Sequence, residues 1–220
     1  SGSINTSSGI TVGAGGSLFY SSSVALDKAP TLSGTVGSRA KLGGTGTISA
    51  AVALNNLNNV LSPGNSPGIL NFGTSQTWQS YTYEWEVNNW TGTTAGTDFD
   101  QIAITGALSL SGSSYVLDLL SLTSANVAGD VPNFSETNRS WKILTSTGGI
   151  TGFDASEWSV NAAGFTNPDT GLWSVSQVGN DLELSYVVIV PEPSAVLLGG
   201  FGLVVTGWVV RRRQRGLGRR

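Results

Sequence analysis

Apolar residues along the first 190 positions recur in short runs with a two-residue period, and no stretch keeps a 3.6-residue apolar period over three helical turns. The alternation is clearest at residues 81–88, where aromatic side chains take one face of the predicted strand and Glu84 and Glu86 take the other. Gly, Asn, Ser and Pro separate the runs, as turn residues do between strands. The pattern predicts an all-β body in which each strand buries one face.

Residues 1–77 carry a loose repeat. Ser or Thr alternates with Val, Ile or Leu in runs that begin near positions 9, 16, 32 and 42, with Gly between them. One short strand per turn of chain fits a right-handed parallel β-solenoid, or β-helix, in which each coil pairs with its neighbours. The segment 61–70 contains Pro63-Gly64 and Pro67-Gly68, and both dipeptides suit type II turns.

The first 75 residues resemble the passenger-domain repeats of autotransporter-type β-helices. The alternative is an ordinary pair of turns in another β fold. Residues 78–189 differ, because their predicted strands have one aromatic, buried face. We expect this region to form a C-terminal β cap or a small sandwich, since an uncovered solenoid end is an exposed sheet edge. The expected domains are therefore 1–77, 78–189 and 190–220.

Composition excludes several classes of site. The chain has 220 residues with no Cys, no His and no Met. There is therefore no disulfide, no thiol nucleophile, no Ser-His-Asp triad and no histidine metal ligand. Because translation begins with Met, we expect the printed sequence to lack an upstream leader.

Charge is divided unevenly along the chain. Residues 1–190 hold 13 acidic and 5 basic side chains, a net charge of −8, whereas residues 191–220 have a net charge of +5; together they give the overall −3. An acidic body lacks the basic stripe that nucleic acid binding requires. The asymmetry indicates that the tail has a task of its own.

The tail has three parts in a fixed order. Pro191, Glu192 and Pro193 cannot form regular helix. Sixteen uncharged residues, 195–210, follow and would span about 24 Å as a helix, close to the ~30 Å of a bilayer core. We expect a single C-terminal transmembrane helix there, with a cytoplasmic basic anchor behind it. Its expected anchor side chains are Ala195, Leu197, Leu198, Phe201, Leu203, Val204, Val205, Trp208, Val209 and Val210, and those of the basic anchor are Arg211, Arg212, Arg213 and Arg215.

This order, from Val190 to about Arg215, resembles the PEP-CTERM sorting signal of Gram-negative bacteria. The resemblance implies an exported protein that a membrane exosortase recognises through Pro191, Glu192 and Pro193. It also implies removal or exchange of the tail near that motif, transient anchoring in the inner membrane, and association with exopolysaccharide and biofilm matrix.

Two carboxylates are the best candidates for carbohydrate chemistry. Glu84 and Glu86 lie two positions apart on one strand face, roughly 6.5–7 Å from each other. That separation falls between those of retaining and inverting glycosidases. The alternative is a solvated strand face.

Two further groups deserve comparison. Asp98 and Asp100, with Asn88 or Asn89, could supply oxygen ligands to Ca²⁺, although two Asp at a strand entry are also common in turns. Some β-helices are polysaccharide lyases with basic catalytic groups, and Arg39 and Lys41 near Asp27 are the residues of that type. The alternative for them is solvent-facing charge on the coils.

The sequence therefore predicts an exported, exosortase-sorted structural or adhesin-like protein of the cell surface or matrix, without enzymatic activity, cofactor or metal. Its expected partners are exosortase, the membrane and exopolysaccharide or other cell-surface components, but not nucleic acid. The alternative is a carbohydrate-binding or carbohydrate-active β-helix module. A Ca²⁺-stabilised adhesin is a third hypothesis.

Overall fold

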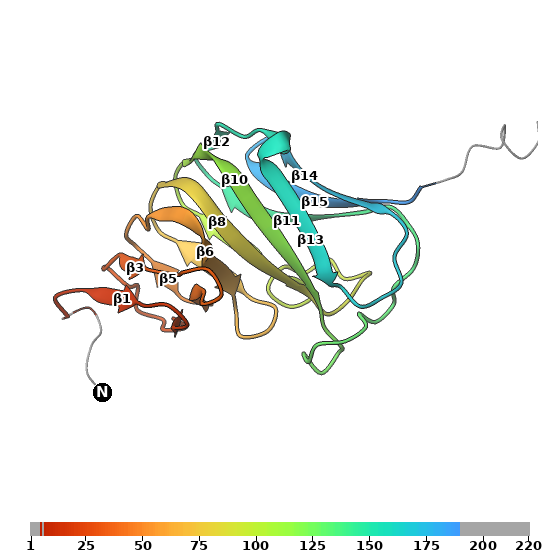
Figure 1. Ribbon diagram of the computed structural model, residues 1–220, viewed down its shortest axis with the longest axis horizontal. Coiled ribbons are helices and arrows are strands. Elements are labelled where there is room, and N and C mark those ends of the chain that lie inside the picture. The colour runs from red at the N-terminus through yellow and green to blue at the C-terminus, as the bar shows by residue number, and fades with distance from the viewer. Residues whose placement is uncertain (1–4, 6, 190–220) are drawn as a thin grey trace, which may run out of the picture. The chain divides into compact units, whose positions relative to one another are not determined.

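The computed structural model of the protein describes residue 5 and residues 7–189. Residues up to Val187 belong to one compact unit, and a second unit begins at Val188. The described residues form fifteen β-strands and the short 3₁₀ helix η2 (Ala155–Glu157), and they contain no α-helix (Figure 1). The predicted all-β class is confirmed for this part of the chain.

The strands form one short sheet and two large sheets. The short sheet pairs β1 (Ile10–Val12) with β3 (Pro30–Leu32). The seven-stranded sheet contains, in spatial order, β12 (Ile150–Thr151), β10 (Leu108–Ser121), β8 (Gln76–Val87), β6 (Leu54–Pro63), β4 (Ala40–Gly44) and β2 (Ser17–Phe19), with β13 (Trp158–Gly164) also paired to β10. The six-stranded sheet contains β14 (Leu172–Val178), β15 (Asp181–Val187), β11 (Arg139–Ser146), β9 (Gln101–Ile104), β7 (Ile69–Phe72) and β5 (Thr47–Ile48).

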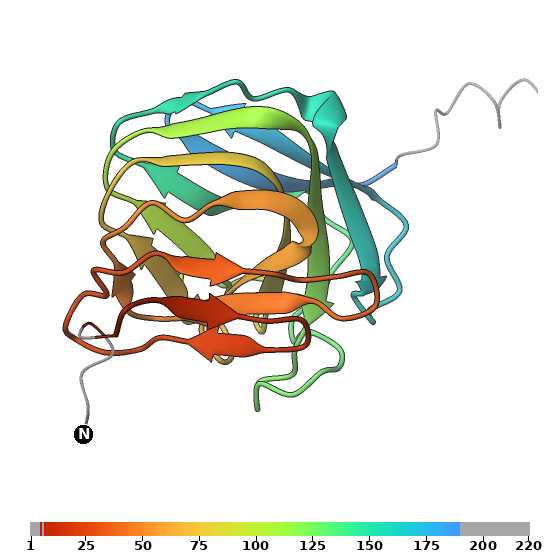
Figure 2. The same ribbon diagram turned by 60° about the vertical axis from the view of Figure 1, so that its left-hand side comes forward.

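From β4 to β11, consecutive strands alternate between the two large sheets. Each strand from β4 to β9 pairs in parallel with the strand that comes two later in the chain, as β4 does with β6 and β5 with β7. Figure 2 shows the result as successive strands stacked side by side in two walls. Two consecutive strands, which we call one passage of the chain, thus add one strand to each of the two large sheets.

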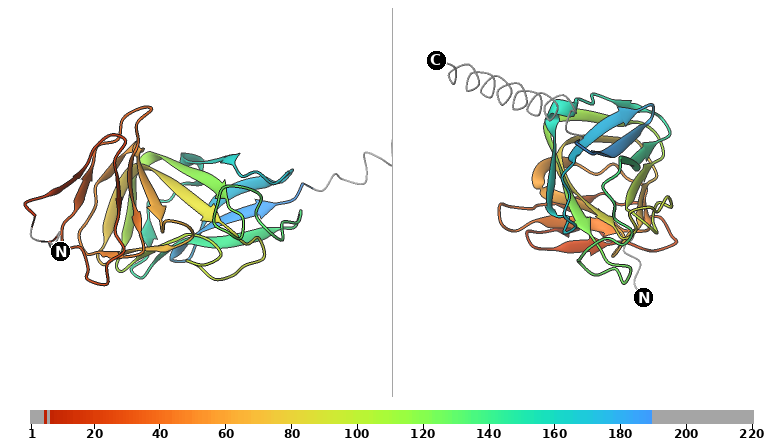
Figure 3. Two further views of the ribbon diagram at one scale, coloured as in Figure 1. Left: turned by 90° about the horizontal axis from the view of Figure 1, so that it is seen from below. Right: turned by 90° about the vertical axis from the view of Figure 1, so that its right-hand side faces the viewer.

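The parallel pattern ends at the C-terminal side of the six-stranded sheet. There β15 pairs antiparallel with both β11 and β14. Figure 3 shows these last strands of the body at one end of the stack and β1 to β3 at the other. A tight turn at Gly179, whose φ is 61°, joins β14 to β15 and permits the antiparallel pairing.

The change of sequence character at residue 77 is not a break in the fold. Strand β8 runs through this position and pairs with β6 on one side and β10 on the other. The aromatic residues after position 77 therefore continue the same sheet. Strand β10 (Leu108–Ser121) likewise continues along the same sheet through a shift of register between Leu110 and Ser114.

Aromatic side chains fill the space between the walls. Trp78, Trp85 and Trp90 have no exposed surface, so they are packing residues. The Tyr83 hydroxyl donates a hydrogen bond of 3.0 Å to the Ile143 carbonyl, so a side chain of β8 reaches across to the backbone of β11. Trp85 contacts Trp141 with ring centroids 5.5 Å apart, edge to face, a favourable geometry for aromatic rings.

The two Pro-Gly dipeptides differ in conformation. Gly64 has φ = 75°, as the predicted type II turn requires. The second prediction is wrong, because Gly68 does not have a positive φ. Close packing explains this second glycine, since a Cβ there would lie 2.5 Å from the Cα of Gly64.

Gly112 provides a test of the strand packing. It lies at the register shift of β10, and a Cβ at this position would lie 1.4 Å from the Gln79 carbonyl oxygen of β8. Gly112→Ala should lower the free energy of unfolding by roughly 1–3 kcal/mol, measured by urea denaturation, because the backbone must move. Gly13→Ala is the control, since no atom lies within 4 Å of its Cβ position. Equal effects of the two substitutions would contradict the packing argument.

Candidate functional site

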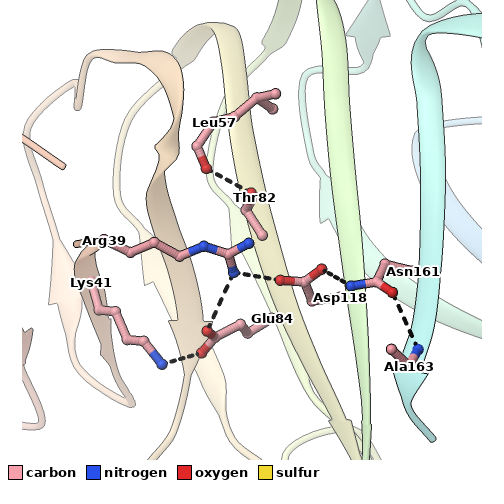
Figure 4. A network of polar contacts seen from close by, with 8 residues as sticks. All are labelled: Arg39, Lys41, Leu57, Thr82, Glu84, Asp118, Asn161 and Ala163. Atoms are coloured by element: carbon pink, nitrogen blue, oxygen red, sulfur yellow. Dashed lines mark hydrogen bonds and ion pairs between the residues drawn. The ribbon is translucent and has the colours of Figure 1, made fainter. Parts of the chain in front are cut away.

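A cluster of charged side chains lies on the outer face of the seven-stranded sheet (Figure 4). Arg39 Nη1 lies 2.5 Å from Asp118 Oδ2 and 3.9 Å from Glu84 Oε1. Lys41 Nζ lies 2.7 Å from Glu84 Oε2. Asn161 Nδ2 donates to the other oxygen of Asp118 at 2.9 Å. These five residues are called the charge cluster below.

Strand register brings the charge cluster together. Asp118 of β10 lies opposite Glu84 of β8, and Asn161 of β13 lies opposite Asp118. Arg39 directly precedes β4 and Lys41 lies within it, with β6 between β4 and β8. The two long basic side chains therefore reach across β6 to the carboxylates.

Burial makes these contacts stronger than ordinary surface ion pairs. The side chains of Glu84 and Asp118 are each 11% exposed, whereas those of Arg39 and Lys41 are 41% and 35% exposed. Two carboxylates on adjacent strands would repel each other in so dry an environment. The two cations compensate both charges, so the cluster is neutral.

Residues that the sequence suggested for two different functions therefore lie together in the charge cluster. Glu84, proposed from the sequence for carbohydrate chemistry, is held by Arg39 and Lys41, proposed separately for a lyase. Asp27 is not part of the cluster; its backbone N–H donates a hydrogen bond of 3.1 Å to Asn5 Oδ1. Sequence reasoning missed Asp118, although a carboxylate between two buried leucines was a usable signal.

Glu86 lies on the same outer face but outside the ion pairs. Burial raises the pKa of its carboxyl above the usual 4.5, and the negative charge of Glu84 adds to this effect while Lys41 opposes it. The two glutamates therefore have different environments, since Glu84 alone is directly paired with cations. With its raised pKa, Glu86 is a better proton acceptor than an ordinary glutamate.

The residues considered for Ca²⁺ separate into two places. Asn88, Asn89 and Asp98 line a pocket of about 260 Å³ together with Asn133. Asp98 accepts hydrogen bonds there from the Asn89 amide at 3.1 Å and from the Thr94 backbone N–H at 2.9 Å. Its oxygens therefore already stabilise the loop.

Asp100 lies elsewhere and is fully buried. Its carboxylate accepts from the backbone N–H groups of Gly68 at 2.8 Å and Glu86 at 3.1 Å, so it ties the second Pro-Gly segment to β8. Burial raises its pKa well above 3.8, and the charge of Glu86 adds to the effect. In the described part of the chain, no three Asp or Glu side chains are arranged to hold a metal ion.

A larger pocket, of about 510 Å³, lies beside the six-stranded sheet. Gln101 of β9, Lys142 of β11 and Glu183 of β15 contribute to it, and the loop at 92–99 forms part of its wall. Arg139, at the start of β11, also lines it and donates from Nη2 to the Gly92 carbonyl at 3.0 Å. The sequence did not single out any of these residues.

The predicted sorting motif, membrane anchor and basic anchor lie at 191–215, outside the described residues. Among residue 5 and residues 7–189, no helix is long and apolar enough to cross a membrane.

The charge cluster predicts a measurable loss of stability when one cation is removed. Arg39→Gln should lower the free energy of unfolding by about 1–3 kcal/mol, between the values for exposed and buried ion pairs, because Asp118 and Glu84 lose compensation. Urea denaturation measures the change. Lys142→Gln is the matched control, because the Lys142–Asp181 pair is more exposed, at 57% and 19%. A loss no larger than that of the control would contradict the assigned role.

The raised pKa values predict how stability changes with pH. A carboxyl whose folded pKa exceeds its unfolded value binds its proton more tightly in the folded state, so stability falls as pH rises from about 4.5 through the raised folded pKa. Glu86→Gln cannot ionise and should make the decline of Tm with pH shallower. Thermal unfolding measured in steps from pH 4.5 to 7 tests this. Parallel curves for wild type and Glu86→Gln would contradict it, and Asp27→Asn, at an exposed carboxylate, is the control.

Comparison with known protein families gives a match at the C-terminal end of the chain. A PEP-CTERM protein-sorting motif matches residues 190–213. No curated protein matches the chain. The matched range contains Pro191, Glu192 and Pro193 and three of the four predicted anchor arginines, so it confirms the predicted sorting signal. The motif supports a PEP-CTERM protein and implies an exported chain that is sorted through the membrane and processed by exosortase.

Proposed function

We propose that the protein is a structural or adhesin-like component of the cell surface or of the extracellular matrix, delivered there by exosortase. The observation that carries this proposal is the sorting motif at 190–213, which directly follows a compact β body ending at Val187. A folded domain followed by a dedicated processing signal is the organisation of a cargo protein. Biofilm or exopolysaccharide is its proposed surrounding.

The tail has the properties that this role requires. Its sixteen uncharged residues, 195–210, are proposed to span the membrane as a helix, and the arginines from Arg211 onward to remain in the cytoplasm. The body then lies on the opposite side of the membrane from the arginines. Exosortase acts at Pro191, Glu192 and Pro193 and releases or transfers the body.

For the body, we propose a right-handed parallel β-solenoid with β13, β14 and β15 as its C-terminal cap. Support comes from the alternation of consecutive strands between two sheets and from the parallel pairing of strands two apart. Parallel crossover connections are right-handed in about 98% of cases, which favours that hand. Such a body is a rigid spacer, as a surface protein needs.

We propose no enzymatic activity. A glycosidase needs one carboxylate free to donate a proton and another positioned across a cleft. Glu84 is engaged by two cations, and Glu86 lies on the same strand rather than across a cleft. The ion pairs and the hydrogen bond of the charge cluster are better explained as interactions that hold β4, β8, β10 and β13 in register.

Replacement of the motif tests the sorting proposal. Substituting alanine for Pro191, Glu192 and Pro193 together should leave an unprocessed precursor in the membrane fraction of the producing bacterium, because exosortase no longer recognises the chain. Immunoblotting of membrane and extracellular fractions measures this.

The control is Arg219→Ala with Arg220→Ala, which alters the same tail outside the matched residues 190–213. This variant should mature normally. Normal maturation and delivery of the triple variant would exclude the sorting role.

A further inference from the structure

We propose that the 510 Å³ pocket beside the six-stranded sheet binds a carboxylate-bearing sugar unit of the uronic acid type, with Arg139 as the carboxylate-binding residue. The pocket size lies within the range of small-molecule sites, about 300–1,000 Å³. This binding site is separate from the sorting signal and from the charge cluster. It would give the body a function of its own after sorting.

The state of Arg139 is the first argument. Among the five basic residues before position 191, Arg39, Lys41 and Lys142 each form an ion pair with a carboxylate, whereas no carboxylate of the described residues lies within 4 Å of Arg139. Its side chain is only partly exposed, and its Nε has no hydrogen-bond acceptor in the described part of the chain. A half-buried guanidinium whose charge no carboxylate compensates favours an anionic ligand, and its planar fork matches a carboxylate.

Neighbouring side chains hold the guanidinium in place. Its Nη2 donates to the Gly92 carbonyl at 3.0 Å, and its Cζ lies 5.5 Å from the centre of the Trp141 ring. Trp141 is itself packed against Trp85 and Trp173, so it offers a rigid surface. A cation that is fixed before binding loses less entropy when a ligand arrives.

The acidic side of the pocket distinguishes a sugar acid from a simple anion. Glu183 of β15 lines the pocket, and no basic side chain of the described residues lies within 4 Å of its carboxylate. Its negative charge disfavours every anion, but its oxygens accept hydrogen bonds from hydroxyl groups, which a sugar acid has and acetate lacks. The amide of Gln101 donates to the Lys142 carbonyl at 3.0 Å, which leaves its oxygen as another acceptor for hydroxyls. The pocket therefore suits a ligand that has one carboxylate and several hydroxyls.

The ion pair of Lys142 limits how much negative charge the pocket can bind. It lines the pocket, but its Nζ lies 2.6 Å from Asp181 Oδ2 and is already paired. One cation, Arg139, is thus open to the ligand. The expected ligand has a single negative charge per sugar unit, as in a polymer of uronic acid.

The experiment titrates the full chain in detergent with three probes: a galacturonic acid trimer, maltotriose as a neutral trimer of similar size, and acetate. Isothermal titration calorimetry gives the affinities. We expect the acidic trimer to bind more tightly than either other probe. Arg139→Gln should weaken this binding on the order of tenfold, the value of one charge-assisted contact. Lys28→Gln removes another cation, outside the pocket, and should leave the affinity unchanged.

Four results would overturn the proposal: no binding of the acidic trimer, equal binding of maltotriose, equal binding of acetate, or unchanged affinity in Arg139→Gln. If that variant does not fold, amide shifts of the wild-type chain replace it. Addition of the acidic trimer should then move the signals of Gln101, Lys142 and Glu183, and shifts confined to other residues would exclude the pocket. The sorting experiment is independent, because it depends only on the tail.

Discussion

Parallel backbone hydrogen bonding between strands two apart in the chain determines which side chains of the body meet. Side chains of a β-strand point alternately inward and outward, so a strand that is held in register has a fixed inner face. In β8 the inner face carries Tyr83 and Trp85, and the outer face carries Glu84. The aromatic core and the charge cluster are therefore two consequences of one register.

Because the body has few basic side chains, the position of each one determines which carboxylates are neutralised. Only five basic side chains precede position 191, and two of them neutralise Glu84 and Asp118 in the charge cluster. Because both carboxylates are mostly buried, the arrangement favours strands aligned so that the cations can reach them. On the other wall, Arg139 is fixed by a carbonyl and an aromatic ring and has no carboxylate partner. The same low charge thus produces a compensated cluster on one wall and an uncompensated cation on the other.

Local sequence predicted the strands well where alternation was uninterrupted. The alternating run that begins at Tyr81 lies within β8, and its aromatic residues Tyr81, Tyr83 and Trp85 are buried as predicted. It failed where contacts between distant segments changed the local geometry. Gly68 has no positive φ because Gly64 and Asp100 fix its position, and β10 continues through a register shift because Gly112 packs against Gln79.

The sequence by itself determined the all-β class, the buried face of the main strands and the sorting signal, because each of these depends on residues close together in the chain. Only the tertiary structure decided which charges meet. Arg39 and Asp118 are 79 positions apart, and Lys41 and Glu84 are 43 apart. The separation along the chain contains no information about such pairs, since strand order and register across β4, β6, β8 and β10 determine them. The pocket at Arg139 has the same origin, because β9, β11, β15 and the loop at 92–99 come together only in the folded protein.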